Sequence, residues 1–121
     1  MDWNFRNDQP IYSQLTQRLT EAIVSGIYAP GEKLPSVREL AVEAGVNPNT
    51  MQRALAELER TGLVYTQRTA GRFVTEDAAV VDSAKQELAH QQIGAFLHRM
   101  ERMGYDREQT AQLVRSWEED A

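Results

Sequence analysis

The sequence has no cysteine and no long apolar run. Without cysteine the chain forms no disulfide and offers no thiolate to a metal ion, which fits a reducing compartment such as the cytoplasm. No apolar stretch approaches the roughly 18 residues that span a bilayer, and the first residues, MDWNFRND, do not look like a secretion signal. We therefore expect a cytoplasmic protein with no membrane partner.

A surplus of positive charge, which is typical of proteins that bind nucleic acid, is missing as well. The 121 residues include 13 lysines and arginines and 18 aspartates and glutamates, for a net charge of -5. Residues 1–77 hold 8 basic and 10 acidic side chains, and residues 78–121 hold 5 and 8. Because salt screens charges over about 8 Å under physiological conditions, the positions of the few cations matter more than this total.

The first part of the chain predicts a helix followed by a turn. Pro10 suits the first turn of a helix and Gly26 suits its end. A Pro30–Gly31 turn and a short extended segment around Leu34 come next. The apolar stripe of the helix is predicted to consist of Ile11, Leu15, Leu19, Ala22 and Ile23.

Two short helices separated by a tight turn are predicted after this segment. Ser36 and Glu39 have the spacing of a capping box at the start of the first of them. Gly45 suits a left-handed helix end, and Asn47 can cap the second helix, which we expect to end at Gly62. The pattern therefore predicts a helix-turn-helix.

A hairpin is predicted next, because residues 63–74, LVYTQRTAGRFV, alternate like two strands joined by a turn at Thr69–Gly71. A helix, a short strand, two helices and a hairpin in this order are typical of an α+β fold, the winged helix-turn-helix. Two strands alone are marginally stable, so we expect the hairpin to pack on the helices. We assign residues 1–77 to this domain.

Residues 78–121 are predicted to form a two-helix tail. Apolar residues keep helical spacing as far as Gly104, and Asp106 and Gln109 have capping spacing before a second helix. Two such helices cannot bury their apolar faces alone, so they fold onto the first domain or pair with a second copy of the chain. We expect a homodimer, because a two-fold contact is the commonest way to cover such a stripe. The predicted dimerisation residues are Val81, Ala84, Leu88, Phe96, Leu97 and Met100.

Polar side chains on the helix-turn-helix and the hairpin predict a surface that binds DNA. Amides, hydroxyls and guanidinium groups are the groups that contact base edges and phosphates. Arg38 lies beside the free N–H groups of a helix start, and the two arginines that flank the hairpin turn can reach the backbone or the minor groove. The arginines should converge on one surface of the molecule. The predicted contact residues are Ser36, Arg38, Asn47, Asn49, Thr50, Gln52, Arg53, Arg68, Gly71 and Arg72.

Plainer roles remain open for several of these residues. Asn47 can do no more than cap its helix. Arg53 has Glu57 one turn later, which is the spacing of an exposed ion pair. Arg38 can be merely solvated, and the arginines of the hairpin can merely keep it soluble.

Other functions have less support in the sequence. An enzyme or a metal site has little to use, because the two histidines, His90 and His98, lie eight positions apart on one predicted helix without a carboxylate pair beside them. We expect no cofactor. The main alternative is a winged helix that serves as a protein-interaction adaptor and does not bind DNA. The tail is short for a typical ligand pocket of about 300 to 1,000 Å³, so a small-molecule effector would need a cleft between subunits near Phe96, Tyr105 or Trp117.

Residues 30–74, PGEKLPSVRELAVEAGVNPNTMQRALAELERTGLVYTQRTAGRFV, resemble the GntR family of bacterial transcription regulators. PIYSQL near the start, VNPNT and the short helical tail resemble the YtrA-type branch of that family. The resemblance implies a homodimer that is joined by its tail helices, binds a palindromic operator and acts as a repressor, often of transporter genes.

The resemblance also implies which residues contact the operator. These are Arg38, Asn49, Thr50 and Arg53, with the wing around Gly71 in the minor groove. The chain departs from the wider family in the recognition helix, where arginines are replaced by Pro48 and Gln52, and in the wing, where the usual first glycine is Thr69.

Overall fold

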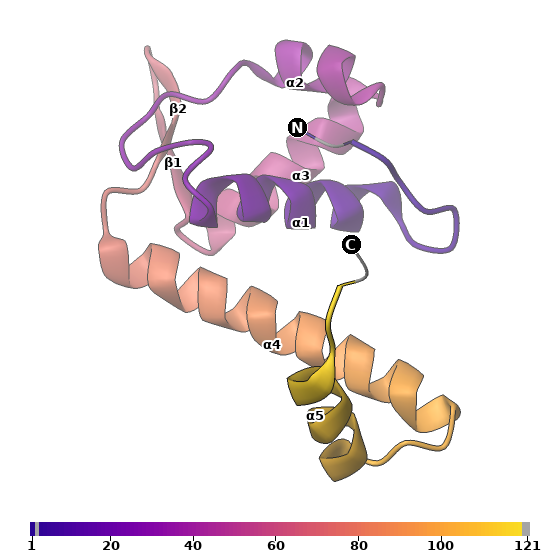
Figure 1. The fold of residues 1–121 in the computed structure, drawn as a ribbon. Coiled ribbons are helices and arrows are strands. Elements are labelled where there is room, and N and C mark those ends of the chain that lie inside the picture. Colours follow the sequence, from indigo (N-terminus) through magenta and orange to yellow (C-terminus); the bar gives the residue numbers. More distant parts are fainter. Residues whose placement is uncertain (2, 120–121) are drawn as a thin grey trace. The chain divides into compact units, whose positions relative to one another are not determined.

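The computed structural model describes Met1 and residues 3–119, and in that part of the chain it contains five helices and one two-stranded sheet (Figure 1). The chain divides into two compact units, residues 1–86 and 87–121. The predicted winged helix-turn-helix order is confirmed. The elements are α1 (Ile11–Val24), α2 (Val37–Ala44), α3 (Pro48–Arg60), β1 (Val64–Gln67), β2 (Gly71–Val74), α4 (Ala78–Arg102) and α5 (Arg107–Ser116).

The starts and ends of α2 and α3 follow from local side-chain chemistry, as predicted. The Ser36 hydroxyl accepts the Glu39 N–H at 3.1 Å, and the Glu39 carboxylate accepts the Ser36 N–H at 3.4 Å. Gly45 ends α2 with φ 70°, a left-handed conformation that costs glycine little. Asn47 then caps α3 by accepting the Asn49 N–H at 2.8 Å. This tight turn sets the angle between the two helices.

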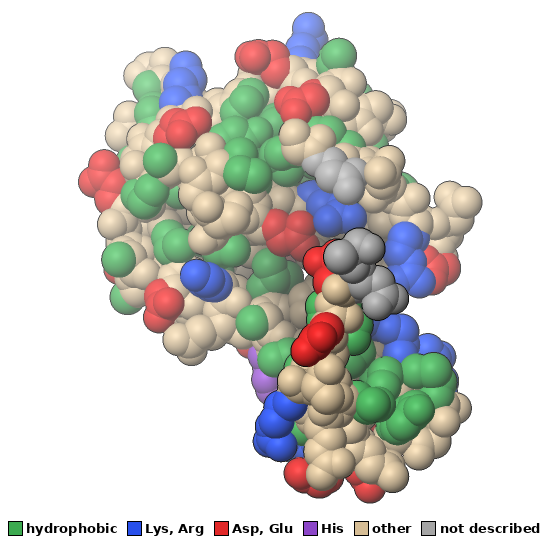
Figure 2. Space-filling view, in the orientation of Figure 1, with side chains coloured by type: hydrophobic (Ala, Val, Ile, Leu, Met, Phe, Trp, Pro, Cys, Tyr) green, Lys and Arg blue, Asp and Glu red, His purple; other side chains and the backbone are tan. Residues whose placement is uncertain are grey.

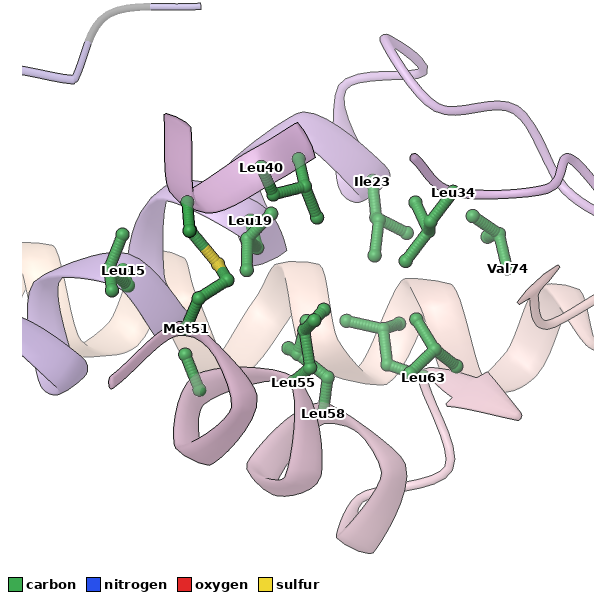
Figure 3. Close-up of a cluster of buried hydrophobic side chains, with 13 residues drawn as sticks. Leu15, Leu19, Ile23, Leu34, Leu40, Met51, Leu55, Leu58, Leu63 and Val74 are labelled. Carbon is green, nitrogen blue, oxygen red and sulfur yellow. The ribbon is translucent and has the colours of Figure 1, made fainter. Parts of the chain in front are cut away.

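The core of the first unit is formed where α1 and α2 pack against α3 (Figure 3). Its largest side chains are almost completely inaccessible to solvent, and burying each leucine contributes about 1.5 to 3 kcal/mol. The Ile11 side chain is 36% exposed, so the predicted stripe on α1 begins one turn later. The buried side chains drawn and labelled are Leu15, Leu19, Ile23, Leu34, Leu40, Met51, Leu55, Leu58, Leu63 and Val74.

Gln14 takes a buried place on α1 that the apolar pattern did not predict. Its side chain is 8% exposed, and every bond it forms ties the segment before α1 to the helix. The Gln14 oxygen accepts the Arg6 N–H at 2.7 Å, and its amide donates to the carbonyls of Arg6 and Gln9 at 2.7 and 3.1 Å. Because these bonds satisfy the buried amide, its burial costs little.

The wing is wider than the predicted hairpin. β1 pairs with β2 in the antiparallel register that places Tyr65 opposite Phe73, and their rings stack at 5.7 Å. The segment after the Pro30–Gly31 turn pairs with the other edge of β2, through a bridge between Lys33 and Phe73. This third segment was predicted only as extended, and it covers an edge that a hairpin would leave open.

Gly71 starts β2 in a conformation that excludes most other residues. Its φ is 113°, and a Cβ at this position would lie 2.9 Å from Cε of Lys33. The Lys33 side chain therefore passes directly over the backbone at the tip of the wing.

The second unit begins at residue 87 and contains the later part of α4 and the whole of α5. Asp106 and Gln109 form the predicted capping box at the start of α5, with bonds of 2.8 and 3.0 Å. Figure 2 shows hydrophobic side chains gathered on the surface of this part, while acidic and basic side chains are interspersed over the visible face. None of the helices in the described residues is long and apolar enough to span a membrane. The large exposed apolar side chains of this unit are Ile93, Met103, Tyr105, Leu113, Val114 and Trp117.

The start of α4 belongs to the first unit. Val80, Val81 and Ala84 are partly buried and pack against its core. The compact unit thus extends past the boundary at residue 77 that we expected from the sequence, and two predicted dimerisation residues contact their own chain.

Candidate nucleic-acid interface

The outward face of α3 carries the polar residues of its first turns. Asn49, Gln52 and Arg53 are exposed and Thr50 is half-buried, whereas Met51 on the opposite face is completely buried. The separation of the two faces follows from helical periodicity. The start of α3 is closed by its own cap: Pro48 has no N–H, the Asn47 side chain accepts the Asn49 N–H, and the Asn47 carbonyl accepts the Thr50 N–H at 3.0 Å. The polar side chains of this face, rather than backbone N–H groups, are therefore what α3 offers to a partner.

Arg38 lies in the first turn of α2, next to the Ser36 cap. It is exposed and forms no ion pair with any residue that the structure describes. The Ser36 hydroxyl already accepts the Glu39 N–H, so its lone pairs are partly used within the helix. The charge of Arg38 is therefore not offset by an acidic partner among the described residues, and it lies beside a helix start, which is an arrangement that favours a phosphate.

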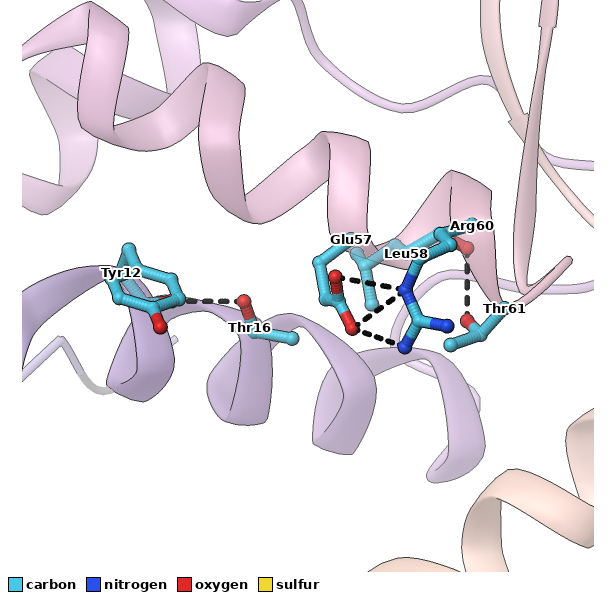
Figure 4. Close-up of polar contacts among 6 residues, drawn as sticks. All are labelled: Tyr12, Thr16, Glu57, Leu58, Arg60 and Thr61. Carbon is cyan, nitrogen blue, oxygen red and sulfur yellow. Dashed lines mark hydrogen bonds and ion pairs between the residues drawn. The ribbon is translucent and has the colours of Figure 1, made fainter.

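Arg53 does not pair with Glu57, which was its plainer predicted role. Glu57 instead accepts a two-pronged contact from Arg60, with Nε 3.1 Å from each carboxylate oxygen (Figure 4). The hydrogen bond from Arg60 lowers the pKa of Glu57, which keeps the carboxylate ionised and occupied. The Arg53 guanidinium lies over the ring of Tyr12 in α1, with Cζ 3.6 Å from the ring centroid.

The wing is joined to the end of α3 through Glu59. One oxygen of the Glu59 carboxylate accepts both the Thr66 hydroxyl at 2.5 Å and Nε of Arg72 at 2.6 Å. The bond from Thr66 is the largest cause that lowers the pKa of Glu59, and Arg72 lowers it further. Arg68, at the turn of the wing, is exposed without an ion pair to a described residue. We call the Glu59, Thr66 and Arg72 contacts the helix–wing clamp.

The helix–wing clamp sets Arg72 apart from the other arginines that were predicted to contact DNA. Arg72 is only 20% exposed and is partly neutralised by Glu59. Among the described residues, Arg38, Arg53 and Arg68 are the predicted contact arginines without an acidic partner. The sequence carried no local signal for the clamp, because Arg72 and Glu59 are thirteen positions apart. The pairing of Glu57 with Arg60, by contrast, follows a spacing of three residues that is visible in the sequence.

The sequence profile of the bacterial regulatory proteins of the gntR family matches residues 11–74, which include α1, the helix-turn-helix and the wing. The chain belongs to the GntR family. It is 38% identical to the HTH-type transcriptional regulator YhcF of Bacillus subtilis over 98% of both chains. It is 48% identical to the HTH-type transcriptional repressor YtrA of the same organism, over 60% of this chain and 56% of YtrA.

Solved structures of GntR-family proteins share the fold. A GntR family transcriptional regulator from Listeria monocytogenes is 39% identical and superposes with a TM-score of 0.84, over 94% of this chain and 100% of the other. The DNA-binding domain of AraR, in complex with operator ORX1, is 28% identical with a TM-score of 0.56, over 60% of this chain and 93% of the other. These relatives are regulators rather than enzymes, and they confirm the winged-helix fold and the likeness to YtrA.

Proposed function

We propose that this GntR-family chain is a cytoplasmic, homodimeric repressor that binds a palindromic DNA operator. The observation that carries the proposal is the exposed polar face at the start of α3, where Asn49, Gln52 and Arg53 stand away from the core. A solvated helix would satisfy the same pattern, but here the carboxylate one turn further along α3, Glu57, is occupied by Arg60. The charge of Arg53 therefore remains available to an external partner.

Each contact residue has a role in this proposal that its chemistry supports. Arg38 and the first N–H groups of α2 bind phosphates. Asn49, Gln52 and Arg53 reach base edges in the major groove, because amides and guanidinium groups pair with purine edges. Thr50, Ser36 and Asn47 lie at the helix starts and help to hold the DNA backbone.

The wing has two roles in the proposal. Arg68 and the backbone at Gly71 lie at its tip and enter or follow the minor groove. Arg72 mainly holds the wing against α3, because its Nε is bonded to Glu59 and its side chain is largely covered.

We further propose that the second unit joins two copies of the chain. Val81 and Ala84 pack against their own core, so the contact depends on the later predicted residues Leu88, Phe96, Leu97 and Met100. The exposed apolar side chains of the same unit extend this surface, and large exposed apolar areas usually mark an interaction site. The apolar side chains added to the predicted set are Ile93, Leu113, Val114 and Trp117.

A dimer of this kind explains repression. Its two α3 helices, held about 34 to 36 Å apart or in a bent variant of that spacing, would enter successive major grooves of a palindrome. A promoter that is covered in this way excludes the polymerase. The likeness to the YtrA-type branch supports transporter genes as targets, and a footprint upstream of the protein's own gene is the first place to look.

The proposal is tested by selecting duplexes from a random-sequence pool with the full chain. We expect an enriched palindrome whose binding weakens steeply with salt. Arg38 and Arg68 from two protomers make four phosphate contacts, which give a slope of about -3.6 for the logarithm of affinity against the logarithm of salt. If no sequence is enriched, or if binding is insensitive to salt, the adaptor alternative is favoured.

The dimer is tested separately by sedimentation without DNA. Leu113→Asp places a charge on the exposed apolar face of α5, and Val42→Asp is the matched control, because Val42 is 83% exposed on α2 outside the tail. We expect Leu113→Asp to weaken self-association about tenfold or more, which is at least about 1.4 kcal/mol. Equal effects of the two substitutions would show that the tail does not form the contact.

A further inference from the structure

We propose that Tyr12 is a positioning residue for the recognition helix, which holds Arg53 ready to contact DNA. The inference rests on the proposed DNA-binding function. Its basis is the stacking of Arg53 on the Tyr12 ring, with Cζ 3.6 Å from the ring centroid. A cation over an aromatic face is attracted by the negative charge of that face. Tyr12 lies in α1, which itself carries no predicted contact residue.

Stacking preserves the groups that Arg53 needs for recognition. An arginine has five N–H donors in the plane of its guanidinium group. A carboxylate partner such as Glu57 would occupy some of these donors and offset the charge. An aromatic ring uses the flat face of the group instead, so the donors at its edge stay free for a bidentate contact to guanine.

The neighbouring charges favour this arrangement over a salt bridge. Glu57, one turn along α3, accepts three hydrogen bonds from Arg60 and keeps both carboxylate oxygens occupied (Figure 4). Within the described residues Arg53 forms no ion pair, and its guanidinium group contacts the Tyr12 ring. The local pairing of Glu57 with Arg60 thus leaves Arg53 to the ring.

Tyr12 is itself held firmly. It lies in the first turn of α1, two positions from the buried Gln14, whose bonds to Arg6 and Gln9 fasten this end of the helix. The Thr16 hydroxyl donates to the Tyr12 carbonyl at 2.8 Å. The backbone that carries the Tyr12 ring is therefore anchored, and an arginine stacked on the ring loses part of its rotamer freedom before DNA arrives.

Two polar residues of the PIYSQL motif, Tyr12 and Gln14, thereby receive separate roles. Gln14 ties the segment before α1 to the helix, which is a task within the fold. Tyr12 is half-buried, and its ring lies under the Arg53 guanidinium. The contact between Tyr12 and Arg53 links the PIYSQL motif to the recognition helix α3, although these two residues lie far apart in the sequence.

A double-mutant cycle tests the inference with the full chain and the duplex that the wild-type protein enriches from the random pool. Tyr12→Leu removes the aromatic face but keeps an apolar side chain that favours helix. We expect it to weaken binding about two- to fivefold, the range of an exposed or partly covered cation–π contact. In an Arg53→Ala background the same substitution should change the affinity less than about twofold.

The conservative variant separates the ring from the hydroxyl. Tyr12→Phe keeps the aromatic face and should bind within about twofold of the wild type. If Tyr12→Phe weakens binding as much as Tyr12→Leu does, the hydroxyl is the active group and the positioning role is wrong. If Tyr12→Leu has the same effect with and without Arg53, Tyr12 serves only the fold.

The ratio of affinities for the selected duplex and for an unrelated duplex distinguishes a loss of sequence recognition from partial unfolding of the variant. A partly unfolded variant loses affinity for both duplexes by the same factor, so the ratio stays constant. We expect Tyr12→Leu to lower the ratio, and an unchanged ratio would contradict the inference. Failure of the wild-type protein to enrich any duplex is a separate result, and it would refute the proposed function on which the inference rests.

Discussion

The helix–wing clamp provides the sharpest test of how this fold is held together. Glu59→Gln keeps the shape of the side chain and one acceptor oxygen, but it removes the charge that Arg72 and Thr66 contact at 2.6 and 2.5 Å. The Arg72 guanidinium, which is 20% exposed, would then be left without its acidic partner. The substitution should loosen the wing from α3 without disturbing the apolar core.

The size of the effect follows from the exposure of the pair. Hydrogen bonds to charged groups are worth about 1.5 to 3 kcal/mol, against about 1 kcal/mol for neutral ones. Glu59 is 33% exposed, so solvent screens part of this difference. We expect Glu59→Gln to lower the free energy of unfolding by about 1 kcal/mol, or the Tm by about 4 to 8 °C for a unit of this size.

Thermal unfolding followed by circular dichroism measures the change, and Glu57→Gln is the matched control. Glu57 lies on the same helix and also pairs with an arginine, but its partner Arg60 is 70% exposed and the contact spans only three residues. The control should therefore have the smaller effect. Equal losses of stability for the two variants would refute the view that the helix–wing clamp is more than a surface ion pair.

The loss of stability caused by Glu59→Gln should depend on pH, in a direction that follows from the pKa of Glu59. The pKa of Glu59 is lowered in the folded chain, chiefly by the hydrogen bond from Thr66. A carboxyl group whose pKa is lowered on folding stabilises the protein at pH values above its pKa in the unfolded chain. This contribution disappears as the pH falls through its pKa in the folded chain. The difference between wild type and Glu59→Gln should be largest near neutral pH and should narrow as the pH falls below the ordinary pKa of glutamate, about 4.3. A constant difference would show that the charge is irrelevant.

The remaining predictions concern the helix-turn-helix. Arg38→Ala should weaken binding to all duplexes alike and reduce the salt slope by about 2 in a dimer, as measured by titration at several salt concentrations. Asn49→Ala should cost about 1 to 3 kcal/mol on the selected duplex and relax the preference at single base pairs, and equal losses on every duplex would contradict it. Asn47→Ala removes the cap on the Asn49 N–H and should lower the free energy of unfolding by about 1 kcal/mol in urea titrations.

The candidate site was predictable from the sequence wherever its chemistry is local. The positions of Arg38, Asn49 and Arg53 on outward faces followed from helical spacing and from the caps at Ser36 and Asn47. What these arginines contact did not follow. The spacing of Arg53 and Glu57 left an ion pair open as the plainer alternative, yet Arg60 competes for the same carboxylate from three positions away and occupies it. Spacing alone names the candidates for a contact but does not choose between them.

The sequence by itself determined the boundaries of the helices in the first unit and the turn between α2 and α3, because caps, glycine stops and apolar periodicity act within one or two helical turns. Tertiary structure alone decided three features: the third segment on the wing, the helix–wing clamp, and the stacking of Arg53 on Tyr12. Each brings together residues from separate elements. Their distances depend on how α1, α3 and the wing pack around the shared core, and no local pattern encodes that packing.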